Sequence, residues 1–237
     1  MEYQQKKRNR IGLKLLVTTF LLFGVISTLS HYLAPRPDAS ATDSQFQPVG
    51  REWFLEQLPL YDLNPITTFL HLVPAFIFML LLGFQLSRSF REKRPKMHRY
   101  MGRLLSVLAV SFAISGVLIG LKFPFGGAIE MLTSSLVGII FLCTLFKGVS
   151  YAIQKNFTEH RLWMFRMVAV SFTPITMRLL MMPIGFLQLA EMQNVFGALM
   201  IISAIFNLAI LELVILKKAA SIKLSFNKKI SSKLVNS

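Results

Sequence analysis

The chain has 237 residues, of which 54% are hydrophobic, and it carries 26 Lys and Arg against 11 Asp and Glu. Charged residues make up 16%, below the roughly 25% of an ordinary soluble domain, so there is too little polar material to coat a water-facing surface. The apolar content excludes disorder. It also leaves little soluble face on which the net charge of +15 would bind nucleic acid. A membrane protein is the interpretation that remains.

Six apolar stretches are long enough to cross a bilayer as helices, for which about 20 residues are needed. They lie near 11–33, 65–86, 104–121, 128–153, 162–186 and 195–216. Because these stretches are continuous and do not alternate, helices are favoured over the strands of a β-barrel. The sequence therefore predicts an all-α, polytopic transmembrane bundle of six spans.

The polar segments divide the chain into five parts. Residues 1–34 combine a basic start with the first span, and 35–64 form an extracytoplasmic loop whose alternating apolar and acidic residues favour an interfacial helix. Residues 65–187 hold a core of four spans, 188–216 the sixth span, and 217–237 a basic, disordered cytoplasmic tail. A cleavable signal peptide in place of the first span stays open, although its apolar stretch is long for one.

Turn residues mark several helix boundaries independently of hydropathy. Asn64-Pro65 and Pro95 are typical of helix starts, and Asn156 with Glu159 resembles a capping box. Gly126-Gly127 predicts the turn between the third and fourth spans.

The basic residues give the bundle an orientation. Lys and Arg gather before the first span, between Arg88 and Arg103, around Arg161 and after residue 216, whereas most acidic residues fall in the alternate connections. By the positive-inside rule, both termini are cytoplasmic. We expect the bilayer, with anionic lipids at its cytoplasmic face, to be the main partner, and no nucleic acid; the oligomeric state stays open.

Two cytoplasmic connections end in similar phrases, one from Met97 to Arg103 and one from Glu159 to Arg166, each with His-Arg at the start of a helix. The second and third spans thus echo the fourth and fifth as a weak internal repeat. An ordered set of short motifs is typical of a known family. It consists of His71, His98-Arg99, Gly102-Arg103, His160-Arg161, Trp163-Met164, Arg166 and Met177-Arg178-Leu179. Over about residues 67–186 the chain resembles the bacterial multi-pass membrane family designated domain of unknown function 2306. The resemblance implies a place in the bacterial cytoplasmic (inner) membrane and candidate residues, but no reaction.

The histidines are candidate cofactor ligands. A b-type haem needs two imidazoles on facing helices, and Arg side chains commonly meet its propionates. His98 and His160 lie at similar depth on the cytoplasmic side, with Arg99, Arg103, Arg161 and Arg166 as candidate partners for an anion. The alternative is that these pairs bind a lipid phosphate, carboxylate or quinone head group at helix N-termini, or only anchor the helices.

Arg178 is the most informative single residue, because a guanidinium inside the hydrocarbon region needs a partner or water. Pro174 is expected to bend its helix and free a carbonyl, producing a polar pocket near the outer layer of His71. The alternative is an arginine that extends to the outer interface.

Three functions stay open. The first is binding of haem or a quinone-like ligand through the His/Arg layers, for electron transfer; the second is transport of a small solute or lipid; the third is assembly without a ligand. No hydrolase, transferase or nucleotide-binding motif is present, catalytic residues are not identified, and the spacing of the histidines does not favour a metal-ion site.

Overall fold

The computed structural model describes Leu22 and residues 63–235, with side chains through residue 217. This part of the chain is built from helices alone. Five segments in it are long and apolar enough to cross a membrane: Pro65–Leu86, Pro95–Lys122, Gly127–Ile153, Phe157–Phe186 and Met192–Lys217. They match the second to sixth expected spans. The first expected span and nearly all of the loop over 35–64 lie outside the described residues, so the count of six and the orientation stay predictions.

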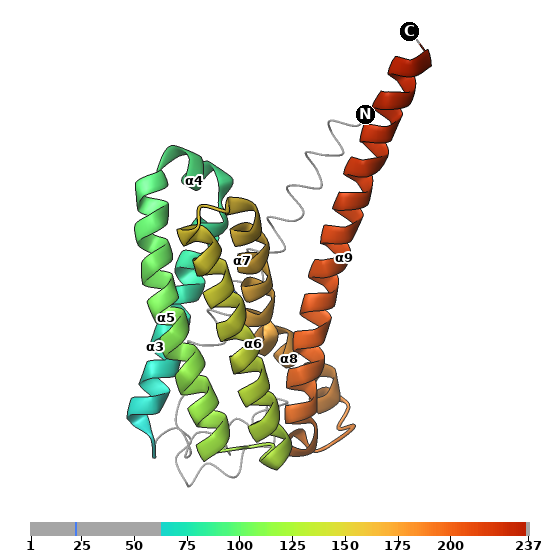
Figure 1. The fold of residues 1–237 in the computed structure, drawn as a ribbon. Helices are drawn as coiled ribbons and strands as arrows, with labels where there is room; N and C mark the ends of the chain where they lie inside the picture. Colours follow the sequence, from blue (N-terminus) through green and yellow to red (C-terminus); the bar gives the residue numbers. More distant parts are fainter. Residues whose placement is uncertain (1–21, 23–62, 236–237) are drawn as a thin grey trace.

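The described helices form an antiparallel bundle (Figure 1). They are α3 (Pro65–Leu86), α4 (Arg88–Lys93), α5 (Pro95–Lys122), α6 (Gly127–Ile153), α7 (Phe157–Ser171), α8 (Thr173–Phe186) and α9 (Met192–Val235). Helix α3 packs on α5, α5 on α6 and α6 on α7, while α9 contacts α6, α7 and α8. The short helix α4 closes the end of the bundle that holds the α6–α7 turn, and α9 projects beyond that end. We call this end the inner end, following the orientation that the charges predict.

The turn residues act as the sequence predicts. Pro65 and Pro95 lie in the first turns of α3 and α5, and the side chain of Asn156 accepts a hydrogen bond from the Glu159 N–H at 3.3 Å. Gly127, the first residue of α6, has a φ of 63°, a left-handed conformation that glycine adopts without strain. Helix α5 begins well before the span expected from residue 104, because backbone hydrogen bonding starts at Pro95 and not at the first apolar residue.

The predicted bend at Pro174 is present as a break between α7 and α8 at Phe172. Pro174 has no N–H to donate, so the helical ladder cannot continue unchanged through this point. The side chains of Ser171, Thr173 and Thr176 around the break are buried. Two of these hydroxyls donate hydrogen bonds within the bundle. Ser171 donates to the Val168 carbonyl, and Thr176 donates to the side-chain oxygen of Asn207 on α9.

Helix α9 continues through Val235, whereas the composition predicts a disordered tail from residue 217. The segment contains neither glycine nor proline, and its Ala, Leu and Lys residues have high helix propensity. The helix therefore extends past its membrane span.

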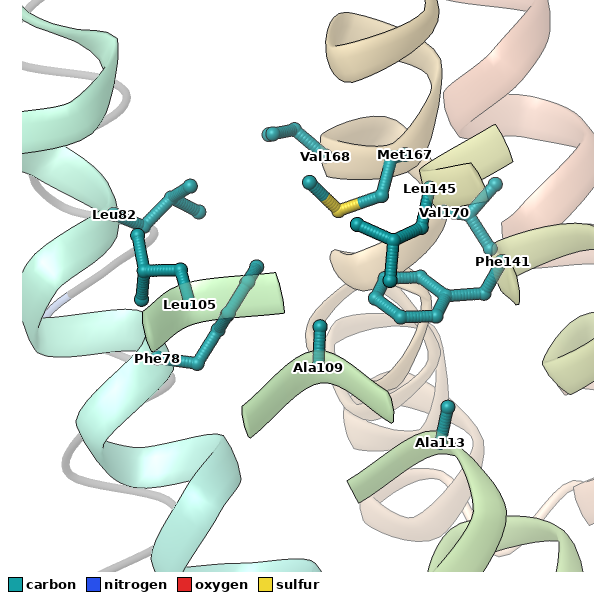
Figure 2. Close-up of a cluster of buried hydrophobic side chains, with 10 residues drawn as sticks. All are labelled: Phe78, Leu82, Leu105, Ala109, Ala113, Phe141, Leu145, Met167, Val168 and Val170. Atoms are coloured by element: carbon teal, nitrogen blue, oxygen red, sulfur yellow. The ribbon is translucent and has the colours of Figure 1, made fainter. Parts of the chain in front are cut away.

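The buried core joins α3, α5, α6 and α7 (Figure 2). Its members are Phe78, Leu82, Leu105, Ala109, Ala113, Phe141, Leu145, Met167, Val168 and Val170. The Phe78 ring meets Phe112 edge-on at 5.1 Å between centroids, and Phe112 in turn contacts Phe141. Because lipid is as apolar as this core, its stability comes from close packing and not from removal of water.

Truncation of Phe78 to alanine should therefore destabilise the bundle by about 1–3 kcal/mol, less than the same change costs in a water-soluble core. Phe84→Ala on the same helix is the control, because Phe84 is 57% exposed. Unfolding of both variants by denaturant in one detergent gives the comparison. Equal stability of the two variants would contradict the packing of Phe78 at the centre of the bundle.

Candidate functional site

His98 and His160 lie together at the inner end of the bundle. His98 is in the first turn of α5 and His160 in the first turn of α7, and both turns lie at this end of the bundle (Figure 1). Helix α6 packs on both α5 and α7. We call these two imidazoles the inner layer, and a ligand shared between them stays a prediction.

The His160 ring is held by the neighbouring helix. Its Nδ1 lies 2.8 Å from the carbonyl oxygen of Gly148 on α6. Since a carbonyl can only accept, Nδ1 carries the proton and Nε2 carries the lone pair. The contact requires a small residue at 148, because a Cβ there would lie 2.6 Å from the sulfur of Met164. Close approach of α6 and α7 thus fixes the tautomer of His160.

His98 also contacts a neighbouring helix, as His160 does, but its ring nitrogen Nδ1 makes no hydrogen bond in the described part of the chain. The amide Nε2 of Gln85 on α3 donates to the main-chain oxygen of His98 at 3.2 Å. A Cβ at Gly102 would lie 2.9 Å from that same Nε2, so glycine makes room for the amide. Two buried atoms here, Nδ1 of His98 and Oε1 of Gln85, have no hydrogen-bond partner within the described part of the chain.

In each hairpin a glycine on one helix packs against a long side chain on the other, and the two hairpins differ in which helix carries the glycine. Gly102 and Met164 each follow a histidine by four residues. In the first hairpin the long side chain, Gln85, comes from the helix before the histidine and packs on a glycine after it. In the second hairpin the order is reversed, since Gly148 comes before and Met164 after. The internal repeat therefore keeps a close helix contact beside each histidine while exchanging which helix carries the small residue.

The arginines around the inner layer have different surroundings. Arg91 on α4, which the sequence did not single out, interacts electrostatically with His98. Arg99 and Arg103 are exposed, and the Arg103 guanidinium lies 5.9 Å from the centre of the Tyr100 ring. Arg161 donates from Nε to the Phe157 carbonyl at 3.0 Å. The rim of the inner layer is thus positively charged.

Arg166 binds a carboxylate of its own chain. Its Nε and Nη2 donate to the two oxygens of Glu212 on α9, at 2.6 and 3.3 Å. The guanidinium also lies 4.7 Å from the centre of the Trp163 ring, which has the Lys147 ammonium 4.3 Å from it. Two cations therefore contact one indole, and a bidentate ion pair fastens α9 to α7.

His71 and Arg178 form the outer layer. His71 Nδ1 lies 2.8 Å from the Phe112 carbonyl of α5, so this ring too is fixed with its lone pair on Nε2. A Cβ at Gly116 would lie 2.8 Å from His71 Cε1, so the ring occupies space that glycine provides. Arg178 on α8 interacts electrostatically with His71, and its Nη1 donates to the Pro174 carbonyl at 3.2 Å. His31, the other histidine that the sequence places outside, lies beyond the described residues.

All eight site residues that the sequence predicts lie in the described part of the chain, and three further residues interact with them. The additions are Gln85, Arg91 and Glu212. Gln85 could have been noticed as a polar amide in the last turn of an apolar span. Glu212 could have been noticed as an acidic residue within the sixth span. Among the described residues no three His, Cys, Asp or Glu side chains gather in one place.

The part of the chain that the structure describes is helical and holds five segments long and apolar enough to cross a membrane, which is typical of a polytopic membrane protein. The family model for predicted membrane protein DUF2306, a domain of unknown function, matches residues 68–215, and the chain belongs to that family. The match extends beyond the expected 67–186 and includes the membrane part of α9. No curated protein and no solved structure matches the chain.

The Arg166–Glu212 pair should show a coupling energy of about 0.5–3 kcal/mol in a double-mutant cycle of Arg166→Gln and Glu212→Gln. The side chains are 25% and 40% exposed, which limits their screening by water. The exposed Arg88–Glu92 pair, at the same 2.6 Å but 78% and 56% exposed, is the control, and a smaller coupling is expected there because water and salt screen exposed charges. Unfolding in one detergent measures both cycles, and similar values would show that α9 is not fastened through this pair.

Proposed function

We propose that the protein is an electron carrier of the bacterial cytoplasmic membrane that binds a b-type haem between His98 and His160. The observation that supports the proposal is the placing of two imidazoles in the first turns of α5 and α7 at one end of the bundle, with Nδ1 of His160 2.8 Å from a main-chain carbonyl. Histidines that ligate a metal donate their other ring N–H in this way, which leaves Nε2 for the iron. The haem would supply a centre that accepts and releases one electron.

The charges at the rim support the same ligand. Two propionate groups need cations at the edge of the bundle, and Arg91 is near His98 while Arg99 and Arg103 are exposed on the same end. Arg166 is the exception among the proposed anion partners, because Glu212 already binds its guanidinium. We therefore assign the propionates to the first hairpin and the α3–α5 connection.

The outer layer has a different chemistry, since one of its two groups is a permanent cation. An imidazole with a lone pair on Nε2 and a guanidinium fit an oxygen head group that both accepts and donates hydrogen bonds, as a quinone and its quinol do. We propose a quinone-like ligand here. Such a ligand would reach the layer from within the membrane.

Protein purified in mild detergent from haem-replete cells should show a Soret band with about one haem per chain. His98→Gln and His160→Gln should each abolish it, because either change removes an axial ligand. His71→Gln is the matched control and should keep the band. A folded, monodisperse and colourless wild-type protein would contradict the proposal, as would a band that persists in both inner variants.

Arg178→Gln should weaken binding of a short-chain quinone by about 10- to 100-fold, the effect of losing a hydrogen bond from a charged donor. Arg103→Gln is the control, because Arg103 is an arginine of the inner end. A titration that follows displacement of a fluorescent quinone analogue gives the affinities. Equal affinities in wild type and Arg178→Gln would rule out this ligand at the outer layer.

A further inference from the structure

The Gln85 side chain lies beside His98, and its orientation is fixed. Its amide faces the main-chain oxygen of His98 at 3.2 Å, and only the NH₂ group can donate to that oxygen. The amide oxygen Oε1 therefore points elsewhere. It is buried and has no partner within the described residues.

The imidazole of His98 also has a buried polar atom without a partner. Its Nδ1 is buried and, in the part of the chain that the structure describes, makes no hydrogen bond. A buried polar atom that lacks a hydrogen-bond partner costs about 1–3 kcal/mol. Here two such atoms belong to residues that are already joined by a hydrogen bond.

The second hairpin shows what this arrangement provides when complete. There the ring Nδ1–H of His160 reaches an oxygen of the preceding helix, the Gly148 carbonyl. In the first hairpin the preceding span is α3, and its residue Gln85 reaches the histidine backbone through the amide Nε2. The amide oxygen of Gln85 is the side-chain acceptor of that residue and is left without a partner in the described part of the chain.

We propose that Gln85 is a positioning residue whose Oε1 accepts the Nδ1–H of His98, so that Nε2 of His98 is directed at the ligand of the inner layer. This hydrogen bond would give a partner to both buried atoms, Oε1 of Gln85 and Nδ1 of His98. Gly102 is part of the device, because a side chain there would displace the amide. The role rests on the proposed function only for the identity of the ligand.

The tautomer of His98 tests the proposal without any ligand. In ¹⁵N-histidine-labelled protein, with the four histidines assigned through His→Gln variants, His98 should be protonated at Nδ1, as His160 is. Gln85→Leu should shift His98 alone toward a mixture of tautomers, whereas Gln85→Glu should retain the Nδ1–H form. A wild-type His98 protonated at Nε2, or one that does not respond to Gln85→Leu, would overturn the assignment.

The haem-loaded protein gives a second, independent measurement. A hydrogen bond to Nδ1–H makes the imidazole a stronger donor to iron, so the midpoint potential should rise in Gln85→Leu and fall in Gln85→Glu. Haem affinity should drop about 10- to 100-fold in Gln85→Leu. A wild-type protein that binds no haem would reject the proposed function and leave the tautomer result to stand, whereas equal potentials and affinities in the two variants would reject the role of Gln85 alone.

Discussion

An imidazole inside a helical membrane bundle has two ring nitrogens that need hydrogen-bond partners, and this requirement governs the surroundings of His71 and His160. Helix carbonyls are normally engaged by their own helix, so an imidazole that uses one must come from a neighbouring helix packed very close. His71 reaches Phe112 on α5, and His160 reaches Gly148 on α6. In both cases Nδ1 is used for structure, and Nε2 is left for chemistry.

The close packing of the helices beside the histidines depends on glycines at three positions. Gly116 leaves room for the His71 ring itself, while Gly148 lets α6 approach Met164 so that its carbonyl meets His160. Gly102 gives the same space to the Gln85 amide. A bundle held mainly by packing can be adjusted at such points by a single methyl group, which makes these glycines part of the site and not only of the fold.

The fold was largely predictable from sequence, whereas the partners of the site were not. Apolar length predicts six spans, five of which fall on described residues and are present as helices. Pro95, Asn156, Gly127 and Pro174 mark helix starts, a turn and the break, because these signals act within a few residues. The contacts of Gln85 with His98 and of Arg166 with Glu212 join separate helices, and helix rotation, which a single sequence does not specify, decides them.

The C-terminal segment is a further case in which composition predicts one property of the structure and not another. Basic composition indicates where residues 217–237 lie relative to the membrane, but it does not determine whether the backbone is helical, and without glycine or proline α9 continues to Val235. The Arg166–Glu212 pair connects that helix to α7, six residues along the chain from His160. The ion pair therefore joins α9 to the helix that holds one of the two inner imidazoles. The sixth span, which lies outside the part of the chain that first suggested the family, thus contacts a helix of the inner layer.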